Sequence, residues 1–398
     1  MSGLPLKPGA MLGVLGGGQL GRMWSHAAQS LGYRTAVLDP DPDSPAGLVS
    51  HLHIQTTYLD PQGLAHMASQ CAAITTEFEN VPAEALAQLQ QQLPVSPGPD
   101  AVRVAQDRAL EKAHFVRCGV PVAPHQVIHN AAELALVPED LLPGILKTTR
   151  LGYDGKGQVR VNSSAELEAG FARLQSGTEP VVCILEKRLP LAAECSVVLA
   201  RSHDGQTVHL PLQTNLHRDG ILAVTEVYDG ALSAETTELA LRSAYDIARQ
   251  LNYVGVLCVE FFLLQDGPER DALGPLVVNE IAPRPHNSGH HSINSCDVSQ
   301  FELQVRCMAG LPLTPPRLHS PCVMLNLLGD MWLQQGDTPV EPNWAQLLAL
   351  PGVHLHLYGK TQAKPGRKMG HVTVTAADMT QARRVALQAA GVLGIAPW

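Results

Sequence analysis

The segment NEIAPRPHNSGH, residues 279–290, concentrates groups that can do chemistry. Glu280, Arg284, His286 and Asn287 place a carboxylate, a guanidinium, an imidazole and an amide close together in the chain. Prolines on both sides of Arg284 fix φ and push the preceding residues toward extended backbone, so the segment is rigid. The run before it, VVNE, predicts a buried strand that ends in a charge. From these residues alone, a polar functional site and a solvated surface turn are both open.

Two carboxylates interrupt strongly apolar runs. Glu260 lies within CVEFF and Glu280 ends VVNE, and a buried carboxylate is costly unless a cation accompanies it. If the two strands lie side by side, both carboxylates face one point, where magnesium bound by carboxylates and phosphate oxygens is the natural occupant. The alternative is a structural salt bridge, which requires two buried basic partners.

A glycine-rich loop, LGYDGKGQ (residues 151–158), has the composition of a flap that folds over phosphates. Its glycines offer backbone N–H donors and Lys156 offers a cation. An ordinary β-hairpin is the alternative. Lys147, in the apolar run GILKTT, weakens that alternative because a lysine in a buried strand needs an anionic partner.

The run ILEKRL places Glu186 and Lys187 at the end of another apolar strand. Backbone groups of such a segment can clamp an adenine, and Glu194, a few residues later, is placed to bind ribose hydroxyls. Each of these residues taken singly is also compatible with a solvated charge at a strand end.

Gly16, Gly18 and Gly21 match the GxGxxG fingerprint of dinucleotide-binding turns, and Asp39 ends the next predicted strand. The motif itself indicates only that backbone closely approaches another group at a helix N-terminus, where N–H groups favour anions. A nicotinamide-dependent oxidoreductase is therefore one hypothesis for this chain.

A basic cluster lies near the C-terminus. Lys360 follows the apolar run VHLHLYG, and Arg367 and Lys368 come after a Pro-Gly turn. On a chain of net charge −9 such a cluster indicates an anionic ligand, for which a phosphate is suited. A solvated turn is the alternative.

Bulk composition narrows the class of protein. The 398 residues are 45% hydrophobic and 16% charged, which predicts two or three folded domains rather than disorder. The negative net charge argues against a nucleic-acid partner, and the longest apolar runs fall short of the ~20 residues that span a membrane. The eight cysteines show no zinc spacing, and the N-terminus lacks the form of a cleavable signal, so we expect reduced thiols in a cytoplasmic protein.

The predicted elements change character along the chain. From residue 11 to about residue 100, strands alternate with helices, which predicts a parallel sheet with helices on its faces, closed by the turn-rich run LPVSPGPD. From about Lys112 a strand-rich α+β module follows, ended by the proline-rich seam LPLTPPRLHSP. The tail predicts three strands and a helix over 379–393.

These motifs together resemble a known family. Lys147, GYDGKGQ, EKRL, Glu194 and the pair Glu260/Glu280 are similar to the ATP-grasp superfamily. GGGQLGRM, TTEFENVP, NEIAPRPHNSGH and YGK…GRKMGH extend the resemblance to the N5-carboxyaminoimidazole ribonucleotide synthetases of purine biosynthesis, over nearly the whole chain. The resemblance implies an ATP-grasp fold with an N-terminal Rossmann-like, biotin-carboxylase-type domain over 1–111, an ATP-grasp domain over 112–315 with a flap subdomain over about 120–188, and a small C-terminal domain over 316–398.

The resemblance also implies roles for individual residues. An ATP site would comprise Arg108, Lys147, Gly152, Tyr153, Asp154, Gly155, Lys156, Gly157, Gln158, Glu186, Lys187, Arg188, Leu189, Glu194, His217, Asn279 and Glu280. Magnesium, which manganese can replace, would be held by Glu260 and Glu280. The ribonucleotide would be bound by Gln19, Leu20, Glu77, Lys360, Arg367 and Lys368. Bicarbonate would be held by Arg284, His286 and Asn287, and the GxGxxG turn would then belong to the ribonucleotide side.

The implied reaction is ATP-dependent carboxylation of aminoimidazole ribonucleotide by bicarbonate, through carboxyphosphate, in a homodimer. The formate-dependent glycinamide ribonucleotide ligases of the same superfamily are an alternative. They have Glu where this chain has Gln19, Asp where it has Asn287, and a serine-rich flap, so the three differences favour the carboxylating enzyme. A non-catalytic nucleotide-binding regulator is a further alternative, against which the intact pair Glu260/Glu280 argues.

Overall fold

The computed structural model describes residues 4–150, 152, 157–175, 180–334 and 338–398. Its N-terminal part contains a parallel four-stranded sheet in the order β3-β2-β1-β4. The strands are β1 (Met11–Leu15), β2 (Arg34–Leu38), β3 (Leu52–Ile54) and β4 (Ala73–Thr76), and the helices between and after them are α1 (Gln19–Ser30), α2 (Pro61–Gln70) and α3 (Ala83–Gln90). The predicted alternation of strands and helices in this part is confirmed.

The turn-rich run after this sheet contains the start of a helix. Pro99 begins α4 (Pro99–Ala105), where its fixed φ suits the first helical turn and its missing N–H costs nothing. The next helix, α5 (Arg108–Arg117), is capped by the Asp107 carboxylate, which accepts from two backbone N–H groups. Helix α5 leads directly into the middle of the molecule.

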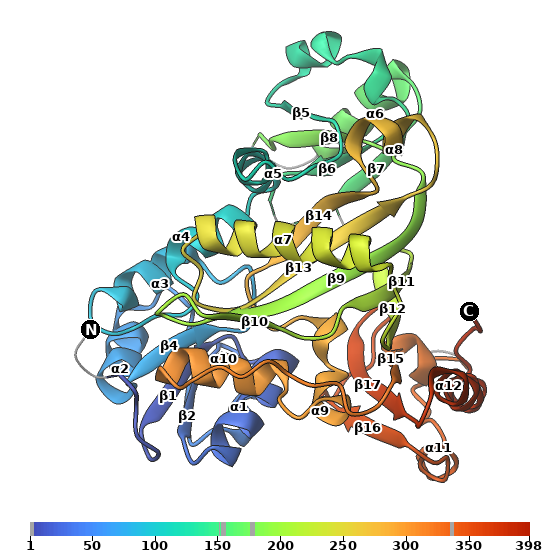
Figure 1. Cartoon of the computed structure of the whole chain (residues 1–398). Coiled ribbons are helices and arrows are strands. Elements are labelled where there is room, and N and C mark those ends of the chain that lie inside the picture. The colour runs from blue at the N-terminus through green and yellow to red at the C-terminus, as the bar shows by residue number, and fades with distance from the viewer. Residues whose placement is uncertain (1–3, 151, 153–156, 176–179, 335–337) are drawn as a thin grey trace.

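A small antiparallel sheet forms the upper lobe in Figure 1. Its order is β5-β8-β6-β7, and helix α6 (Ser164–Leu174) packs on it. The strands are β5 (His125–Ile128), β6 (Gly144–Thr148), β7 (Gln158–Val161) and β8 (Cys183–Lys187). The glycine-rich loop connects β6 to β7, which pair as an antiparallel hairpin.

The largest element is a nine-stranded sheet in the order β14-β13-β9-β11-β12-β15-β17-β16, with β10 paired to β9. The strands are β9 (Leu191–Arg201), β10 (Thr207–His209), β11 (Gln213–Arg218), β12 (Ile221–Val227), β13 (Gly255–Leu264), β14 (Leu276–Ala282), β15 (Cys322–Leu328), β16 (Val353–Leu357) and β17 (Lys368–Thr375). The sheet crosses the predicted domain limit at residue 315 because β15 pairs with β12. The domain limits themselves stay predictions.

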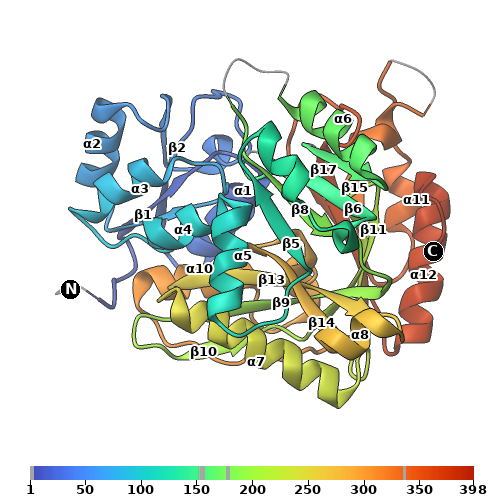
Figure 2. The same cartoon turned by 90° about the horizontal axis from the view of Figure 1, so that it is seen from above.

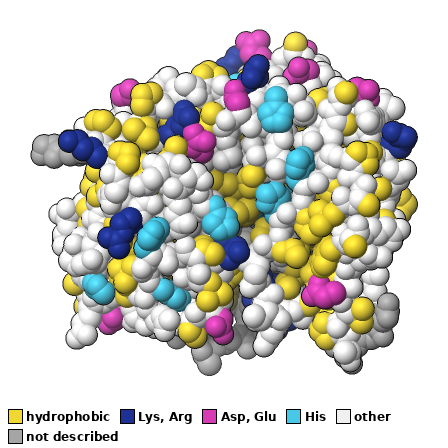
Figure 3. All heavy atoms as spheres, turned by 90° about the horizontal axis from the view of Figure 1, so that it is seen from below, with side chains coloured by type: hydrophobic (Ala, Val, Ile, Leu, Met, Phe, Trp, Pro, Cys, Tyr) yellow, Lys and Arg dark blue, Asp and Glu magenta, His cyan; other side chains and the backbone are white. Residues whose placement is uncertain are grey.

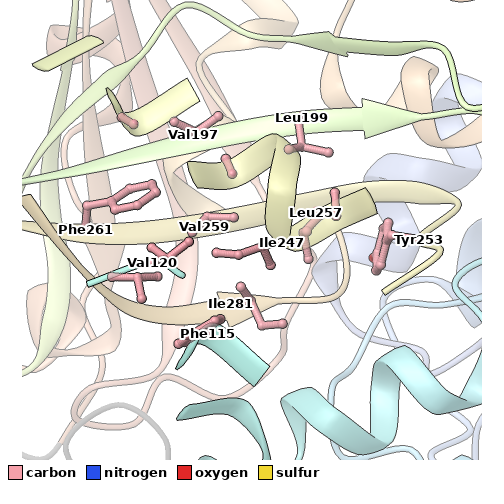
Figure 4. Close-up of a cluster of buried hydrophobic side chains, with 14 of the residues drawn as sticks. Phe115, Val120, Val197, Leu199, Ile247, Tyr253, Leu257, Val259, Phe261 and Ile281 are labelled. Atoms are coloured by element: carbon pink, nitrogen blue, oxygen red, sulfur yellow. The ribbon is translucent and has the colours of Figure 1, made fainter. Parts of the chain in front are cut away.

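Helices cover the central sheet on both sides. Helix α7 (Ala234–Gln250) packs on β9 and β13, where Leu257, Val259 and Phe261 point toward it (Figure 4). Helix α10 (Gln300–Ala309) packs on the other face and also contacts α1, so it joins the N-terminal part to the central sheet. Figure 2 shows the upper lobe lying over the central strands. The remaining helices are α8 (Pro268–Leu273), α9 (Ser292–Ser295), α11 (Trp344–Leu348) and α12 (Met379–Leu393).

One hairpin was not predicted. Strands β11 and β12 are joined at Asp219 and Gly220, both of which have positive φ (50° and 79°). That conformation is typical of a type I′ hairpin turn, and the Asp-Gly pair in the sequence is its usual signal. The omission matters because β11 carries His217, one of the predicted site residues.

No helix in the described part of the chain is long and apolar enough to cross a bilayer. On the face seen from below, lysine and arginine side chains are scattered singly among histidines and hydrophobic groups (Figure 3).

Candidate active site

Glu260 and Glu280 lie directly opposite each other on the neighbouring strands β13 and β14. The register of the pair shifts immediately after Glu260, and such a bulge re-aims side chains beside functional sites. Glu260 is 8% exposed, whereas Glu280 is half-buried. The prediction that the two carboxylates are brought together by adjacent strands is confirmed.

The two carboxylates have different partners. Glu280 Oε2 accepts from Arg108 Nη1 at 2.8 Å, so although burial acts to raise its pKa, the guanidinium lowers it. Glu260 Oε1 lies 3.2 Å from Nε2 of His286. Burial, followed by the nearby charge of Glu280, raises the pKa of Glu260 to about 7. Burial also lowers the pKa of His286 well below its usual value, so the imidazole is neutral at pH 7. A structural salt bridge therefore accounts for Glu280 alone.

The raised pKa of Glu260 has a consequence for stability. Its carboxyl faces Glu280, Glu194, His217, His286 and Lys368. Because the folded-state pKa, about 7, exceeds the ordinary 4.5, the folded protein binds more protons between these values, and stability falls as pH rises through that window. We expect the ligand-free Glu260→Gln variant to match the wild type near pH 4.5 and to be more stable at pH 8. Thermal unfolding across this range tests it, and a variant destabilised at pH 8 would contradict it.

The rigid segment after β14 is held by an ion pair with the N-terminal part of the chain. Arg284 Nε donates to Oε2 of Glu79, and its Nη1 donates to the carbonyl of Pro285 at 3.2 Å. Burial acts to lower the pKa of Arg284, but the Glu79 carboxylate raises it. The guanidinium is thus charged and fixed, with part of its fork still available for an anion.

The tautomer of His286 follows from its neighbours. The backbone N–H of Ser288 points to Nδ1 at 3.3 Å, which makes Nδ1 the acceptor and leaves the ring proton on Nε2, toward Glu260. The backbone of His286 is held by Gln300, which donates to its carbonyl and accepts from its N–H. The ring is therefore held in place on both sides.

Asn287 is buried, and neither atom of its side-chain amide has a hydrogen-bond partner within the described residues. An unsatisfied buried amide is costly, so a polar ligand that pairs with this amide would be favoured. It lies next to His286 and at the start of a short 3₁₀ turn, Asn287–Gly289. The amide can accept and donate at once, as bicarbonate requires.

Lys147 has the anionic partner that the sequence required. Its Nζ lies 3.1 Å from Oε1 of Glu186, and the Nζ of Lys112 lies 3.4 Å from the other oxygen of that carboxylate. Burial opposes ionisation of Glu186, but Lys112 and Lys147 outweigh it and lower its pKa to about 2. Lys112 also donates to the carbonyl of Asn279 at 2.7 Å, which connects the network to β14.

The segment predicted to clamp adenine uses part of its backbone within the protein. The N–H groups of Lys187 and Arg188 donate to the carbonyls of Pro124 and Pro143. Any nucleotide contact from this segment, which ends at Leu189, must use its other backbone groups. The side chain of Lys187 forms an ion pair with Glu269 at 3.4 Å.

Glu194 and His217 form a cross-strand ion pair at 2.7 Å. Burial acts to lower the pKa of His217, but its hydrogen bond to Glu194 and the nearby charges of Glu260 and Glu280 raise it. When it is protonated, His217 adds positive charge close to the two paired carboxylates. The part predicted for Glu194 toward ribose hydroxyls stays a prediction.

The glycine turn before α1 is already filled by a protein carboxylate. Glu77 accepts from the N–H groups of Gly18 at 2.9 Å and of Leu20 and Gly21 at 3.2 Å. A Cβ on Gly18 would lie 2.7 Å from Glu77 Oε1, so the small residue is needed for this close approach. Asp39 accepts from the N–H of Gly17 at 2.7 Å. The dinucleotide hypothesis is wrong, because the anion that this turn receives is Glu77.

The basic cluster near the C-terminus lies along the connection between β16 and β17. Lys360 lines a pocket of about 420 Å³ between the β16–β17 connection and Trp332, and its Nζ donates to the carbonyl of Lys368 at 2.8 Å. Burial acts to raise the pKa of Glu79, but the Arg284 guanidinium and, to a smaller extent, the charge of Lys368 lower it, so Lys368 lies near Glu79. Arg367 Nη1 donates to the carbonyl of Gln362 at 2.8 Å. Gln19 begins α1, the helix whose turn Glu77 fills.

Four of the predicted loop residues, Tyr153, Asp154, Gly155 and Lys156, lie outside the described residues. Gly152 accepts from Arg108 at 3.3 Å through its carbonyl, which places this end of the loop beside Glu280. Gly157 has a positive φ of 69°, and Gln158 lies opposite Lys147 in the β6–β7 hairpin.

Sequence reasoning missed three residues of this site. Glu79 stands two residues after Glu77 in TTEFEN, and this alternation of carboxylates at a strand end was the available signal. Lys112 and Glu111 lie on α5, where nothing local distinguishes them from solvated helix charges. Glu111 accepts from the N–H of Ile281 at 2.7 Å, and burial raises its pKa to about 8.

Three family models match the chain. They are described as "Ribonucleotide synthetase preATP-grasp domain" over residues 10–106, "ATP-grasp domain" over residues 113–301 and "Phosphoribosylaminoimidazole carboxylase C-terminal domain" over residues 322–385. The chain is 43% identical over 369 residues to the N5-carboxyaminoimidazole ribonucleotide synthase of Brucella melitensis, covering 92% of this chain and 97% of that protein.

Solved structures are similar over almost the whole chain. The N5-carboxyaminoimidazole synthetase of Staphylococcus aureus complexed with ADP has a TM-score of 0.86 at 37% identity, covering 97% of this chain and 98% of that chain. The N5-carboxyaminoimidazole synthase of Aspergillus clavatus, in complex with ADP and 5-aminoimidazole ribonucleotide, has a TM-score of 0.83 at 30% identity, covering 97% and 99%.

Proposed function

Because the chain belongs to the N5-carboxyaminoimidazole ribonucleotide synthase family, we infer that it is an ATP-grasp ligase that carboxylates 5-aminoimidazole ribonucleotide with bicarbonate. ATP is converted to ADP and phosphate, and the product is N5-carboxyaminoimidazole ribonucleotide of purine biosynthesis. The observation in this chain that supports the proposal most is the pair Glu260/Glu280 beside the rigid segment that carries Arg284, His286 and Asn287.

The reaction has two parts. An oxygen of bicarbonate attacks the γ-phosphorus of ATP, the bond from that phosphorus to the β-phosphate oxygen breaks, and ADP leaves carboxyphosphate behind. The carboxyl group then passes to the exocyclic amine of the ribonucleotide, which loses a proton as phosphate is released. Carboxyphosphate hydrolyses readily, so both parts must occur at one site from which water is excluded.

Bicarbonate is assigned to Arg284, His286 and Asn287. The fixed guanidinium of Arg284 neutralises the anion, and the unsatisfied amide of Asn287 can accept its hydroxyl proton and donate to an oxygen. The neutral ring of His286 forms the side of the bicarbonate site next to Glu260 and keeps that carboxylate in place. Because the prolines and Gln300 hold this backbone, the nucleophilic oxygen is held without further ordering on binding.

The nucleotide is assigned to the region where the upper lobe meets the central sheet, beside Lys147 and Arg108. Lys147 and Arg108 would face the phosphates. Glu186, which also pairs with Lys112, keeps the ammonium of Lys147 in position. The positive groups would neutralise charge on the phosphoryl group as it transfers, which is the main requirement of such a step. Arg108 must share its guanidinium between Glu280 and the nucleotide.

The donor set formed by Glu260 and Glu280 fits magnesium. Both donors are carboxylates, and the neutral His286 leaves the charge of Glu260 uncompensated by its nearest partner. The ion, when bound, would supply positive charge that stabilises the phosphoryl group as it transfers. The two carboxylates would hold it where the γ-phosphate meets the bicarbonate segment.

The proposed activity is tested by the consumption of ATP with 5-aminoimidazole ribonucleotide, with and without added bicarbonate. We expect ADP formation to require both, and carbon from labelled bicarbonate to appear in the nucleotide product. ATP consumption with glycinamide ribonucleotide and formate instead would favour the formate-dependent ligase and overturn the proposal. Cytoplasmic location and a homodimer stay predictions. The molar mass in solution, measured by light scattering, tests the second.

The phosphate of the ribonucleotide is assigned to Lys360, Arg367 and Lys368, so Arg367→Ala should weaken ribonucleotide binding selectively. Loss of one charge-assisted hydrogen bond costs on the order of 1.5–3 kcal/mol, which is roughly a tenfold to hundredfold loss in kcat/KM. We expect the KM for the ribonucleotide to rise while the KM for ATP barely changes.

Steady-state kinetics with each substrate varied in turn measures this effect. The matched control is Arg384→Ala, which removes an exposed arginine on α12. If both KM values stay at the wild-type level, or if only ATP binding is lost, the phosphate pocket lies elsewhere.

Glu79→Gln should raise the KM for bicarbonate by roughly tenfold, because Arg284 loses the anion that orients its guanidinium. The KM for ATP should stay near the wild-type value, since Glu79 belongs to the N-terminal part of the site. The exposed Glu84→Gln on α3 is the control. An unchanged bicarbonate dependence would show that Arg284 does not depend on Glu79.

A further inference from the structure

A sulfur, an oxygen and a nitrogen donor converge beside the candidate magnesium site. Ligand atoms of Cys258, Glu260 and His286 all lie within 4.8 Å of one another. Cys258 and Glu260 are two residues apart on β13, so their side chains share one face of the strand, opposite the face that packs on α7. His286 approaches from the segment after β14, with its Nε2 3.2 Å from Glu260 Oε1.

This donor set suits a different class of metal ion from magnesium. Magnesium takes oxygen ligands, whereas a thiolate, an imidazole and a carboxylate are the ligands of zinc and similar borderline cations. Zinc-ligand bonds of about 2.0–2.3 Å place tetrahedral donors about 3.3–3.8 Å apart. The nitrogen and oxygen here are already at that spacing, so side-chain movements of about an ångström complete the site. Three protein ligands leave a fourth position open.

We propose that Cys258, Glu260 and His286 bind a zinc-class divalent cation, and that this cation inhibits the enzyme. A cation bound there removes Glu260 from the magnesium site and His286 from the bicarbonate site. The binding step stands on the donor geometry alone, whereas the inhibition rests on the proposed function. The thiol proton of Cys258 leaves to solvent as the thiolate binds the metal, so charge and atoms balance.

The surroundings of the three ligands favour this site. Metal binding requires the other tautomer of His286, in which the proton moves from Nε2 to Nδ1 and the Nε2 lone pair faces the metal. Ser288 Oγ, 3.0 Å from Nδ1, can accept that proton in place of the Ser288 N–H contact. The same hydroxyl lies 3.9 Å from Cys258 Sγ. Ser196 contacts Ser288 Oγ at 2.8 Å and holds it between the two ligands. Ser288 thus orients both the nitrogen and the sulfur donor.

Cobalt(II) alone, added to the nucleotide-free full chain, tests the binding step. We expect one equivalent to give a thiolate-to-cobalt charge-transfer band with the visible bands of a four-coordinate ion, and zinc to displace it. Cys258→Ser should lose the charge-transfer band and bind cobalt at least about a hundredfold more weakly. Cys258→Ala should also lose the band and bind cobalt weakly. Agreement between the two variants, together with an unchanged thermal unfolding midpoint in each, shows that the loss comes from the missing ligand and not from misfolding.

Cys118→Ser is the matched control, because Cys118 also lies beside a histidine, with Sγ 3.4 Å from Nε2 of His114. We expect that variant to keep the band. A band that persists in both Cys258 variants, or disappears in Cys118→Ser, would overturn the metal site.

Inhibition is measured as turnover against zinc concentration at saturating magnesium and ATP. The wild type should be inhibited, and Cys258→Ser, with unchanged turnover in the absence of zinc, should need about a hundredfold more zinc. Cobalt binding at Cys258 without inhibition would overturn the inhibitory part and leave the metal site standing. If the wild type lacks carboxylating activity altogether, the proposed function fails, and the cobalt result still decides the site.

Discussion

Replacing Glu260 by glutamine is expected to reduce turnover by about a hundredfold or more while the fold survives. The amide keeps the shape of the side chain and can accept from His286, but it removes the negative charge that would hold magnesium opposite Glu280. The loss should be larger at low magnesium and partly recovered at high magnesium. Turnover at saturating substrates, measured against magnesium concentration, checks this.

The matched control for that experiment is Glu238→Gln on α7. Glu238 is exposed and pairs with Arg242 one helical turn away, so its loss should leave the magnesium dependence unchanged. Near-wild-type turnover of Glu260→Gln at low magnesium would contradict the assignment of Glu260 as a metal ligand. Since the same substitution is expected to stabilise the ligand-free protein at pH 8, loss of activity through unfolding is distinguishable.

Replacing Lys112 by methionine is expected to destabilise the protein by about 3 kcal/mol or more. Lys112 is 1% exposed, and it holds both the Glu186 carboxylate and the carbonyl of Asn279. Removing one member of a buried ionic network leaves the opposite charge without full compensation, which costs more than the pair contributed. Lys147 still faces Glu186, so we expect a folded but weakened protein rather than an unfolded one.

Urea denaturation followed by tryptophan fluorescence measures this loss as a shift of the unfolding midpoint to lower urea concentration. Lys187→Met is the control, since Lys187 pairs with Glu269 at a similar distance, but both side chains are about a quarter exposed. An exposed pair of this kind contributes about 0–1 kcal/mol. Equal shifts in the two variants would show that the network of Lys112 is not a buried ionic one.

The sequence by itself determined the local elements. Alternating or continuous apolar runs bounded by Gly and Pro predicted β1, β13 and β14, and the helical spacing predicted α12 over the residues that it occupies. These features depend on burial periodicity within one segment, which is visible in the residues. The pairing of Glu260 with Glu280 was also predicted for two adjacent strands, because a buried carboxylate is costly without a cation.

Only the tertiary structure decided which groups those charges meet. Arg108 is 172 positions from Glu280, and Arg284 is 205 positions from Glu79, and no local pattern relates residues so distant. The same holds for the glycine turn before α1, whose sequence predicts an anion but whose fold supplies Glu77 in place of a dinucleotide phosphate. Which distant residue pairs with a given charged side chain depends on how the sheets and helices pack. The contact between two such residues forms only once the elements between them are folded.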